Sequence, residues 1–246
     1  MYAIINCCDR FHIFAYHTIL TYQILWEDNP FIFRVPYNDI YPKYIKDKFG
    51  DKVELIKSKK PFLDTILSLT KDIDKNEMIY WCSSDTYIDK IHNIEKLKKL
   101  HNFMLECPDN ISGGISTKFK GINKGEYYKK YDDIDLFYRT KMVNAKNINI
   151  WLHQYLRVDI LQNIFKCLEE PKNQVKELDY QLYKDTCPIY NYLSKYNFLC
   201  LDKSYIRYGE NTSRNKITLN CIESLKKYKI DLPNNFEIIN KNLYWG

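Results

Sequence analysis

The strongest constraint on the fold is an alternation of short apolar runs with longer helix-like segments across residues 2–82. The apolar runs are rich in Ile, Val, Phe and Tyr, as β-strands are, and the segments between them have helical length and spacing. Short connections between alternating strands and helices favour a mostly parallel, Rossmann-like α/β sheet with helices on both faces. The predicted strands are 2–6, 31–37, 52–58 and 78–82, and the predicted helices are 11–26, 40–50 and 61–73.

The rest of the chain has a less regular pattern. Apolar residues at helical spacing predict a helix over 88–105, and residues 110–117 predict another strand. Residues 118–140 are charged and tyrosine-rich and are expected to be irregular, whereas the latter part of 147–170 is expected to be helical. A length of 246 residues with 7 Gly and 8 Pro suits a single ordered domain over 1–246.

The charge pattern bears on the partners. The net charge is +6, but the lysines are scattered among acidic residues and form no continuous basic block. A mildly basic surface suits anionic ligands such as nucleotides and acidic glycans. Nucleic acid is therefore not expected as the partner, and a basic nucleic-acid-binding protein is kept as the less favoured alternative.

The cysteines and the hydropathy pattern bear on location. Eight cysteines occur without CxxC spacing, and several lie inside apolar runs, so we expect reduced thiols. The N-terminus has no pattern typical of a signal peptide, and no run of about 18 apolar residues predicts a transmembrane helix. These observations predict a cytoplasmic protein, and the lysine-rich helix near 90–99 leaves peripheral attachment to anionic lipid open.

Two polar loops follow predicted strands, at the positions where ligands bind in parallel sheets. In such sheets the ligand lies beyond the carboxyl ends of the strands, which places "CCDR" (7–10) and "SSDT" (83–86) near it. Asp85 offers a carboxylate to a hard divalent ion, and Ser83, Ser84 and Thr86 offer hydroxyls to phosphate or sugar. A solvated turn with no ligand is the alternative.

Other motifs are absent or less suitable. The sequence contains no GxGxxG after the first strand, no GxxxxGK[ST] and no GxSxG. A literal D-x-D occurs at Asp133 and Asp135, but it follows an irregular stretch and no apolar strand delivers it to a sheet edge. It is a rival metal site to Asp85. His12 and His17, on the first helix, are expected to be packing residues.

The stretch "WCSSDTY" (81–87) resembles the strand end that carries the DxD motif in GT-A nucleotide-sugar glycosyltransferases. Trp81, Cys82, Asp85 and Tyr87 match the form WC-x-D-D-x-Y of small bacterial and viral transferases, and Ser84 stands where the first acid would be. The motif is therefore degenerate. The resemblance implies Mn²⁺ or Mg²⁺ at Asp85, held less firmly than by two acids.

Further stretches resemble the same family in the same order along the chain. They divide it into a nucleotide-binding half (1–107) and an acceptor-side half (108–246). The resemblance implies donor contacts at Ser84 and Asp85, acceptor contacts near the helix after 151, and a C-terminal segment, 208–221, folded back over the diphosphate. The residues implied are Asp9, Arg10, Arg214 and Lys216 for the donor, His153 and Arg157 for the acceptor, and Asp179, with Glu177 as substitute, for the catalytic base.

The activity that this resemblance implies is transfer of a hexosyl or deoxyhexosyl group from a UDP- or GDP-sugar to a hydroxyl of a glycan or glycolipid. Charge building on the leaving diphosphate would be neutralised by the metal or by Arg214 and Lys216. The alternative within the same fold is a non-catalytic module that binds a sugar nucleotide or glycan, which the serine at Ser84 favours.

Overall fold

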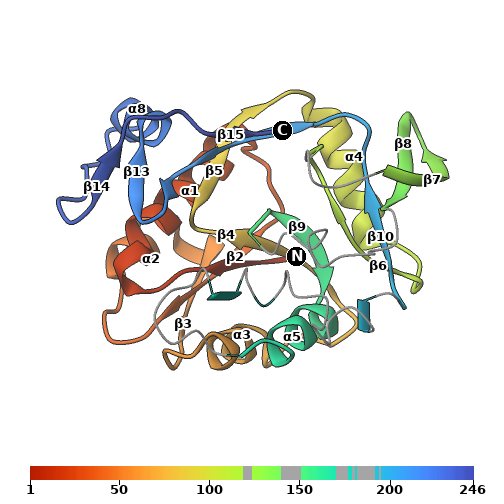
Figure 1. The fold of residues 1–246 in the computed structure, drawn as a ribbon, viewed down its shortest axis with the longest axis horizontal. Helices are drawn as coiled ribbons and strands as arrows, with labels where there is room; N and C mark the ends of the chain where they lie inside the picture. Colours follow the sequence, from red (N-terminus) through yellow and green to blue (C-terminus); the bar gives the residue numbers. More distant parts are fainter. Residues whose placement is uncertain (119–123, 140–150, 170–176, 179–180, 182–191, 194) are drawn as a thin grey trace.

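The computed structural model describes residues 1–118, 124–139, 151–169, 177–178, 181, 192–193 and 195–246 (Figure 1). Its largest element is a nine-stranded sheet with the order β3-β2-β1-β4-β9-β6-β10-β8-β7. β9 and β8 run against the other strands, so the predicted mostly parallel α/β architecture is confirmed. The strands are β1 (Tyr2–Asn6), β2 (Ile32–Tyr37), β3 (Val53–Lys57), β4 (Met78–Ser83), β6 (Ile111–Ile115), β7 (Lys124–Tyr131), β8 (Ile134–Arg139), β9 (Gln154–Arg157) and β10 (Asn197–Cys200).

Helices cover both faces of the parallel half, and β1, β2 and β4 are therefore buried on both sides. Successive side chains of a strand point to opposite faces, and Ile4 packs into one apolar cluster whereas Ala3 and Ile5 pack into another. The first cluster includes residues of α3 and α5, which lie side by side below the sheet in Figure 1. The second includes residues of α1 and α4. The helices are α1 (His12–Leu25), α2 (Lys43–Phe49), α3 (Phe62–Thr70), α4 (Ile94–Leu105), α5 (Val158–Lys166) and α8 (Leu219–Lys227), with short 3-10 turns η1 (Asp9–Phe11) and η2 (Gly50–Lys52).

Two small sheets complete the described part. One has the order β15-β11-β5, with β5 (Thr86–Ile91), β11 (Ile206–Glu210) and β15 (Tyr244–Trp245). The other has the order β12-β13-β14, with β12 (Thr212–Ser213), β13 (Lys216–Thr218) and β14 (Glu237–Ile239). The first of these joins the turn after β4 to the C-terminal part of the chain, because β5 pairs with β11 along its length.

Two local predictions are wrong. The predicted helix 88–105 begins only at Ile94, where the Asn93 side chain caps it by accepting a hydrogen bond from the Lys96 N–H at 2.9 Å. The residues before it form β5. The stretch 118–140, expected to be irregular, contains the β7–β8 hairpin. The helix expected in the latter part of 147–170 is confirmed as α5, and β9 directly precedes it.

β10 has an unusual place in the central sheet. It pairs in parallel with β6 and antiparallel with β8, so it lies between two strands that precede it in the sequence. No helix in the described ranges is long and apolar enough to cross a membrane.

Candidate functional site at the carboxyl edge of the sheet

The turn Ser84–Asp85 follows β4 directly at the carboxyl edge of the parallel strands. The Ser84 N–H donates to the carbonyl oxygen of Asn6, the last residue of β1, at 3.2 Å. The Asp85 N–H donates to Oγ of Ser83 at 3.2 Å. The turn is thus fixed to the two central parallel strands, and the chain leaves it into β5.

Residues 210–212 close over this turn from the C-terminal part of the chain. The Asn211 N–H donates to the carbonyl oxygen of Asp85 at 2.6 Å, and its Nδ2 donates to the carbonyl oxygen of Ser84 at 2.8 Å. The Thr212 hydroxyl donates to Oδ1 of Asp85 at 2.8 Å. The segment 208–221 and the turn, two stretches that the sequence resemblance assigned to one site, therefore lie together.

The Asp85 carboxylate is half-buried and only partly satisfied. Burial raises the pKa of Asp85, and the hydrogen bond from Thr212 opposes that rise. Among the residues that the structure describes, Thr212 is the one recorded donor to this carboxylate, and Oδ2 receives none. That oxygen is the natural point of contact for a cation or a ligand hydroxyl.

Glu210 is a second carboxylate at this edge, and sequence reasoning missed it. It ends β11, directly opposite Thr86 in the β5–β11 pairing. The pKa of Glu210 is raised to about 7, mainly by burial; the nearby Asp85 charge adds to the rise, and a hydrogen bond from the Trp245 side chain opposes it. In the sequence Glu210 is visible only as an acid before "NTS" (211–213). Its proximity to Asp85 arises from the pairing of β11 with β5, which the sequence does not show.

His17 supports the closing segment from below. Asn211 uses its amide N–H to donate to Ser84, so its Oδ1 accepts from Nδ1–H of His17 at 2.7 Å. The other ring nitrogen then accepts from the Ser224 hydroxyl at 2.8 Å. Burial lowers the pKa of His17 to about 4, which keeps the ring neutral and preserves this pattern. The predicted packing role of His17 is confirmed by its complete burial.

His153 lies beneath the turn and not on the surface. Its side chain is 1% exposed, and its Nε2 lies 3.1 Å from the carbonyl oxygen of Ser83 and 2.6 Å from the Thr86 hydroxyl. Because a carbonyl only accepts, Nε2 carries the proton and Nδ1 accepts from the Tyr22 hydroxyl at 2.8 Å. Burial lowers the pKa of His153 to about 4. In this position the ring holds the strand end and presents no face to an acceptor.

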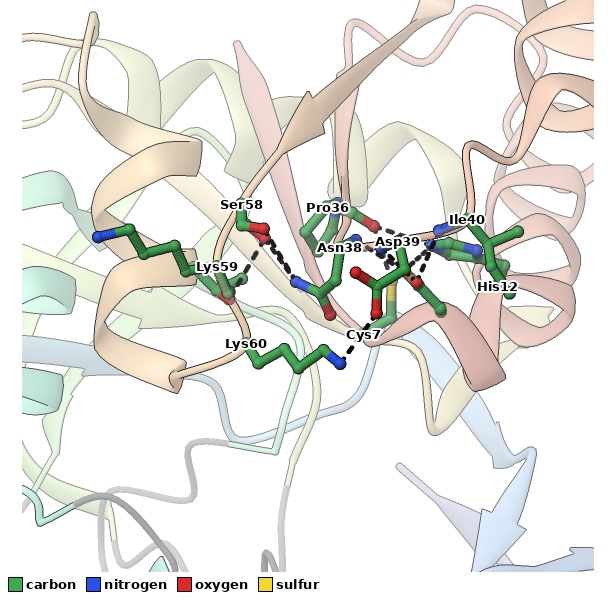
Figure 2. A network of polar contacts seen from close by, with 11 residues as sticks. Cys7, His12, Pro36, Asn38, Asp39, Ile40, Ser58, Lys59 and Lys60 are labelled. Carbon is green, nitrogen blue, oxygen red and sulfur yellow. Dashed lines mark hydrogen bonds and ion pairs between the residues drawn. The ribbon is translucent and has the colours of Figure 1, made fainter.

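Asp9 organises the neighbouring loop after β2, which Figure 2 shows with the loop after β3. Its carboxylate accepts hydrogen bonds from the backbone N–H groups of Asn38, Asp39 and Ile40 at 2.8–2.9 Å. Burial on its own would raise the pKa of Asp9, but these three donors and the nearby His12 lower it overall. The loops are joined further by an ion pair of 2.9 Å between Lys60 and Asp39.

The three predicted donor-side cations differ in their contacts. Arg10 is exposed; it lies 4.4 Å from the centre of the Phe236 ring and donates to the Asn235 carbonyl oxygen. Lys216 pairs with Glu237 at 2.7 Å. Arg214 lies in the exposed turn between β12 and β13, with a left-handed φ of 53°, two residues beyond the Asp85 contact at Thr212. No hydrogen bond or ion pair is recorded between Arg214 and another described residue.

Among the described residues, the predicted position Arg157 does not join this edge. Arg157 pairs in register with Met78, the first residue of β4, and donates to both carboxylate oxygens of Asp159 at 2.8–3.1 Å. It therefore lies at the opposite edge of the sheet from Asp85, and the expectation that it shares the site is wrong. Asp179 lies outside the described residues.

The rival D-x-D is a hairpin turn. Asp133 lies between β7 and β8 and forms ion pairs with Lys96 and Lys99 at 3.0–3.3 Å, while Asp135 is exposed on β8. The turn takes its shape from Asp132, whose φ of 54° is left-handed. The carboxylate of Asp133 is therefore already engaged by α4.

The donor set at the edge suits a metal only in part. Across the described ranges no group of three or more His, Cys, Asp or Glu side chains is placed to hold a metal ion. Asp85 and Glu210 supply two carboxylates, and Mg²⁺ is commonly bound through one or two carboxylates together with substrate phosphates. The residues present therefore fit a divalent ion that a bound diphosphate would share.

A separate small cavity lies between β5, α8 and β15. Its volume is about 160 Å³, and its wall includes Tyr87, Asp89, Glu223, Tyr228 and Tyr244. Much of its polar lining is already engaged, since Tyr87 bonds Asn220 and Asp89 pairs with Arg207. The cavity is distinct from the Asp85 edge.

Comparison with known proteins gives similarities in structure only. No protein-family model and no curated protein sequence matches the chain. Among solved structures it is similar to a UDP-glucose pyrophosphorylase complexed with UDP-glucose (9% identity, TM-score 0.49, covering 93% of this chain and 98% of that one). It is similar to the 4-diphosphocytidyl-2C-methyl-D-erythritol synthase of Anaerococcus prevotii (14%, 0.46, 93% and 95%). It is also similar to the galactosyltransferase LgtC in complex with donor and acceptor sugar analogs (11%, 0.43, 81% and 73%).

Proposed function

We propose that the protein transfers a hexosyl or deoxyhexosyl group from a nucleotide-sugar donor, a UDP- or GDP-sugar, to a hydroxyl of a glycan or glycolipid. The observation that carries the proposal is the closure of the Ser84–Asp85 turn by residues 210–212. This closure holds a half-buried carboxylate, with one oxygen open, at the carboxyl edge of the parallel strands. Ligands of open α/β sheets bind at that edge.

The proposed roles follow from charge and position. Asp85 and Glu210 would hold Mn²⁺ or Mg²⁺ together with the diphosphate, and the ion would neutralise charge on the leaving group. Arg214, exposed and close along the chain to Thr212, would add positive charge there, with Lys216 beside it. In this proposal Glu210, at the end of β11, takes the place of the acid that is absent at Ser84.

The chemistry needs a base and an aligned acceptor. The acceptor oxygen attacks the anomeric carbon as the bond from that carbon to the diphosphate breaks, and the bonding electrons leave with the diphosphate. The acceptor proton passes to a base, for which we propose Asp179. Asp9 and Arg10 are proposed to act on the nucleotide side, where Asp9 would shape the loop through its three backbone contacts.

The first test is a thermal-shift experiment with UDP, GDP, CDP, dTDP and AMP, each with and without Mn²⁺. A ligand that binds only the native state raises its stability by about 2.7 kcal/mol at a hundredfold excess over Kd. We expect one nucleoside diphosphate to stabilise the wild type with Mn²⁺, and Asp85→Asn to abolish that gain. Asp135→Asn, a change in the exposed rival D-x-D, is the matched control and should behave like the wild type.

The result also separates an enzyme from a non-catalytic module. Release of the nucleoside diphosphate from UDP- or GDP-hexoses measures turnover, and Asp85→Asn should reduce it far more than it reduces donor affinity. Donor binding without any release, in wild type and variant alike, would support the binding module that Ser84 favours. Failure of every nucleotide to stabilise the protein would remove both proposals.

A further inference from the structure

The loop after β2 and the start of α2 expose a run of large apolar side chains. Ile40 is 64% exposed, Tyr41 52% and Tyr44 46%. These three residues, here named the 40–44 tip, lie within five positions of one another. Burying apolar surface is favourable, so large apolar groups gathered on a surface indicate an interaction site.

The tip is held outward by specific contacts. Asp9 fixes the backbone of Asp39 and Ile40, because its carboxylate accepts hydrogen bonds from both N–H groups. The ring of Tyr41 packs edge-on against Tyr37 at 5.2 Å between ring centres, and Tyr44 packs against Tyr16 at 5.8 Å. The apolar groups are thus presented by a structured loop and not by a frayed one.

Exposed lysines share the same stretch of chain as the tip. Lys43 lies within it, Lys48 follows Tyr44 by one helical turn, and both are exposed. Lys60 reaches the tip through its ion pair with Asp39, whereas the side chain of Lys59 points away from Asp39 and Ile40 (Figure 2). The acids on the same stretch are fewer: Asp39, already paired with Lys60, together with Asp47 and Asp51.

We propose that the 40–44 tip, together with Lys43 and Lys48, forms a surface that docks on an anionic lipid membrane. Tyrosine and isoleucine suit the boundary between head groups and acyl chains, and lysines around them are attracted to anionic lipids. The alternative membrane surface, the lysine-rich α4, is less suited, because Lys96, Lys98 and Lys99 each form ion pairs with aspartates.

The tip also lies on the side of the molecule that carries the candidate site. Asp9 links it to the loop after β1, and β1 leads to the same edge as the Ser84–Asp85 turn. In Figure 1, α2 and β13 both lie at the left, where β1 points. Docking would bring this edge toward the lipid head groups. If the protein transfers a sugar as proposed above, its acceptor would then be a lipid-linked hydroxyl, and this part of the inference rests on the proposed function.

Vesicle co-sedimentation tests the surface without any substrate. The wild type should bind vesicles of phosphatidylcholine mixed with phosphatidylglycerol, bind pure phosphatidylcholine much less, and lose binding as salt rises. The variant Ile40→Ser/Tyr41→Ser/Tyr44→Ser should lower the partition coefficient by roughly tenfold or more. Lys43→Gln/Lys48→Gln should weaken the preference for phosphatidylglycerol.

Matched controls make the outcome decisive. Leu105→Ser/Ile238→Ser removes exposed apolar groups from other surfaces, with 52% and 56% exposure in the wild type, and should leave binding unchanged. Three outcomes would overturn the proposal. The control and the tip variant could lose vesicle binding equally, the wild type could bind neither kind of vesicle, or the tip variant could abolish a concentration-dependent self-association of the protein. Asp85→Asn should bind vesicles like the wild type, so a failure of the proposed transfer reaction is distinguishable from a failure of docking.

Discussion

Thr212 donates its hydroxyl proton to Oδ1 of Asp85 at 2.8 Å, although 127 positions separate the two residues in the sequence. With the two Asn211 contacts, this bond joins the end of β4 to the C-terminal part of the chain. The candidate site is therefore assembled from two distant stretches. The charge on the Asp85 carboxylate depends on the hydrogen bond between them, because the Thr212 hydroxyl lowers the pKa of Asp85.

Thr212→Val tests that joint, because valine has nearly the shape of threonine and lacks the hydroxyl. The free energy of unfolding should fall by about 1–3 kcal/mol, since a half-buried carboxylate loses its donor. The pKa of Asp85 should rise further, so any stabilisation by Mn²⁺ with a nucleoside diphosphate should require higher pH. Denaturant unfolding and thermal shift at several pH values measure both effects. Thr212→Ser should restore them, and equal behaviour of Val and Ser would contradict this account.

Glu210→Gln tests the buried acid. The raised pKa of Glu210, about 7, means that the native state keeps a proton that the unfolded state releases near 4.5. Its contribution to stability is present below pH 4.5 and is lost as pH rises to about 7. The variant, which is neutral throughout, should match the wild type near pH 4.5 and become relatively more stable above pH 7. Unfolding in EDTA across this range checks it, and a constant difference would argue against the raised pKa.

His17→Gln should show the opposite trend. The pKa of His17 is lowered to about 4, so the unfolded chain takes up a proton near pH 6.5 that the native ring refuses. The stability that the neutral ring contributes is present above pH 6.5 and is lost as pH falls toward 4. The destabilisation by His17→Gln should therefore be largest at neutral pH and shrink on acidification. A difference that grows on acidification would show that the ring is charged in the native state.

Gly209→Ala tests the close contact between β11 and β5. A Cβ at this position would lie 2.5–2.7 Å from ring atoms of Tyr87, which is buried and bonded to Asn220. Overpacking of this kind costs about 1–3 kcal/mol, measurable by denaturant unfolding. The double variant Gly209→Ala/Tyr87→Leu should lose less than the sum of the single variants, because the leucine gives way. If the losses of the two single variants simply add, the destabilisation by Gly209→Ala does not arise from its contact with Tyr87.

The parallel half of the fold was predictable from the sequence for a physical reason. β1, β2 and β4 are buried on both faces, so each appears as a largely apolar run bounded by polar turns. β5 and β9 were missed because a helix follows each of them closely, and the apolar spacing of the helix overlaps the strand. The β7–β8 hairpin was missed because one face of its strands is exposed and rich in Lys and Tyr.

The candidate site was predictable only where it is local. The polar end of β4 located Asp85, since a strand that stops on small polar residues is visible in one stretch of sequence. Glu210 and Asn211 could not be assigned, because their positions depend on the pairing of β11 with β5. Arg157 was misplaced because β9 runs antiparallel, so its last residue lies at the opposite edge from the end of β4.

The place of β10 between β6 and β8 affects the protein while it is being synthesised. Both neighbours are translated first, and β10 follows the end of β8 by roughly sixty residues. At about 5–20 residues per second, the ribosome leaves these two strands without their shared partner for several seconds. During that interval their unpaired backbone groups are open to pairing with other nascent chains. High expression should therefore favour aggregation during synthesis, and slower translation or early chaperone binding should relieve it.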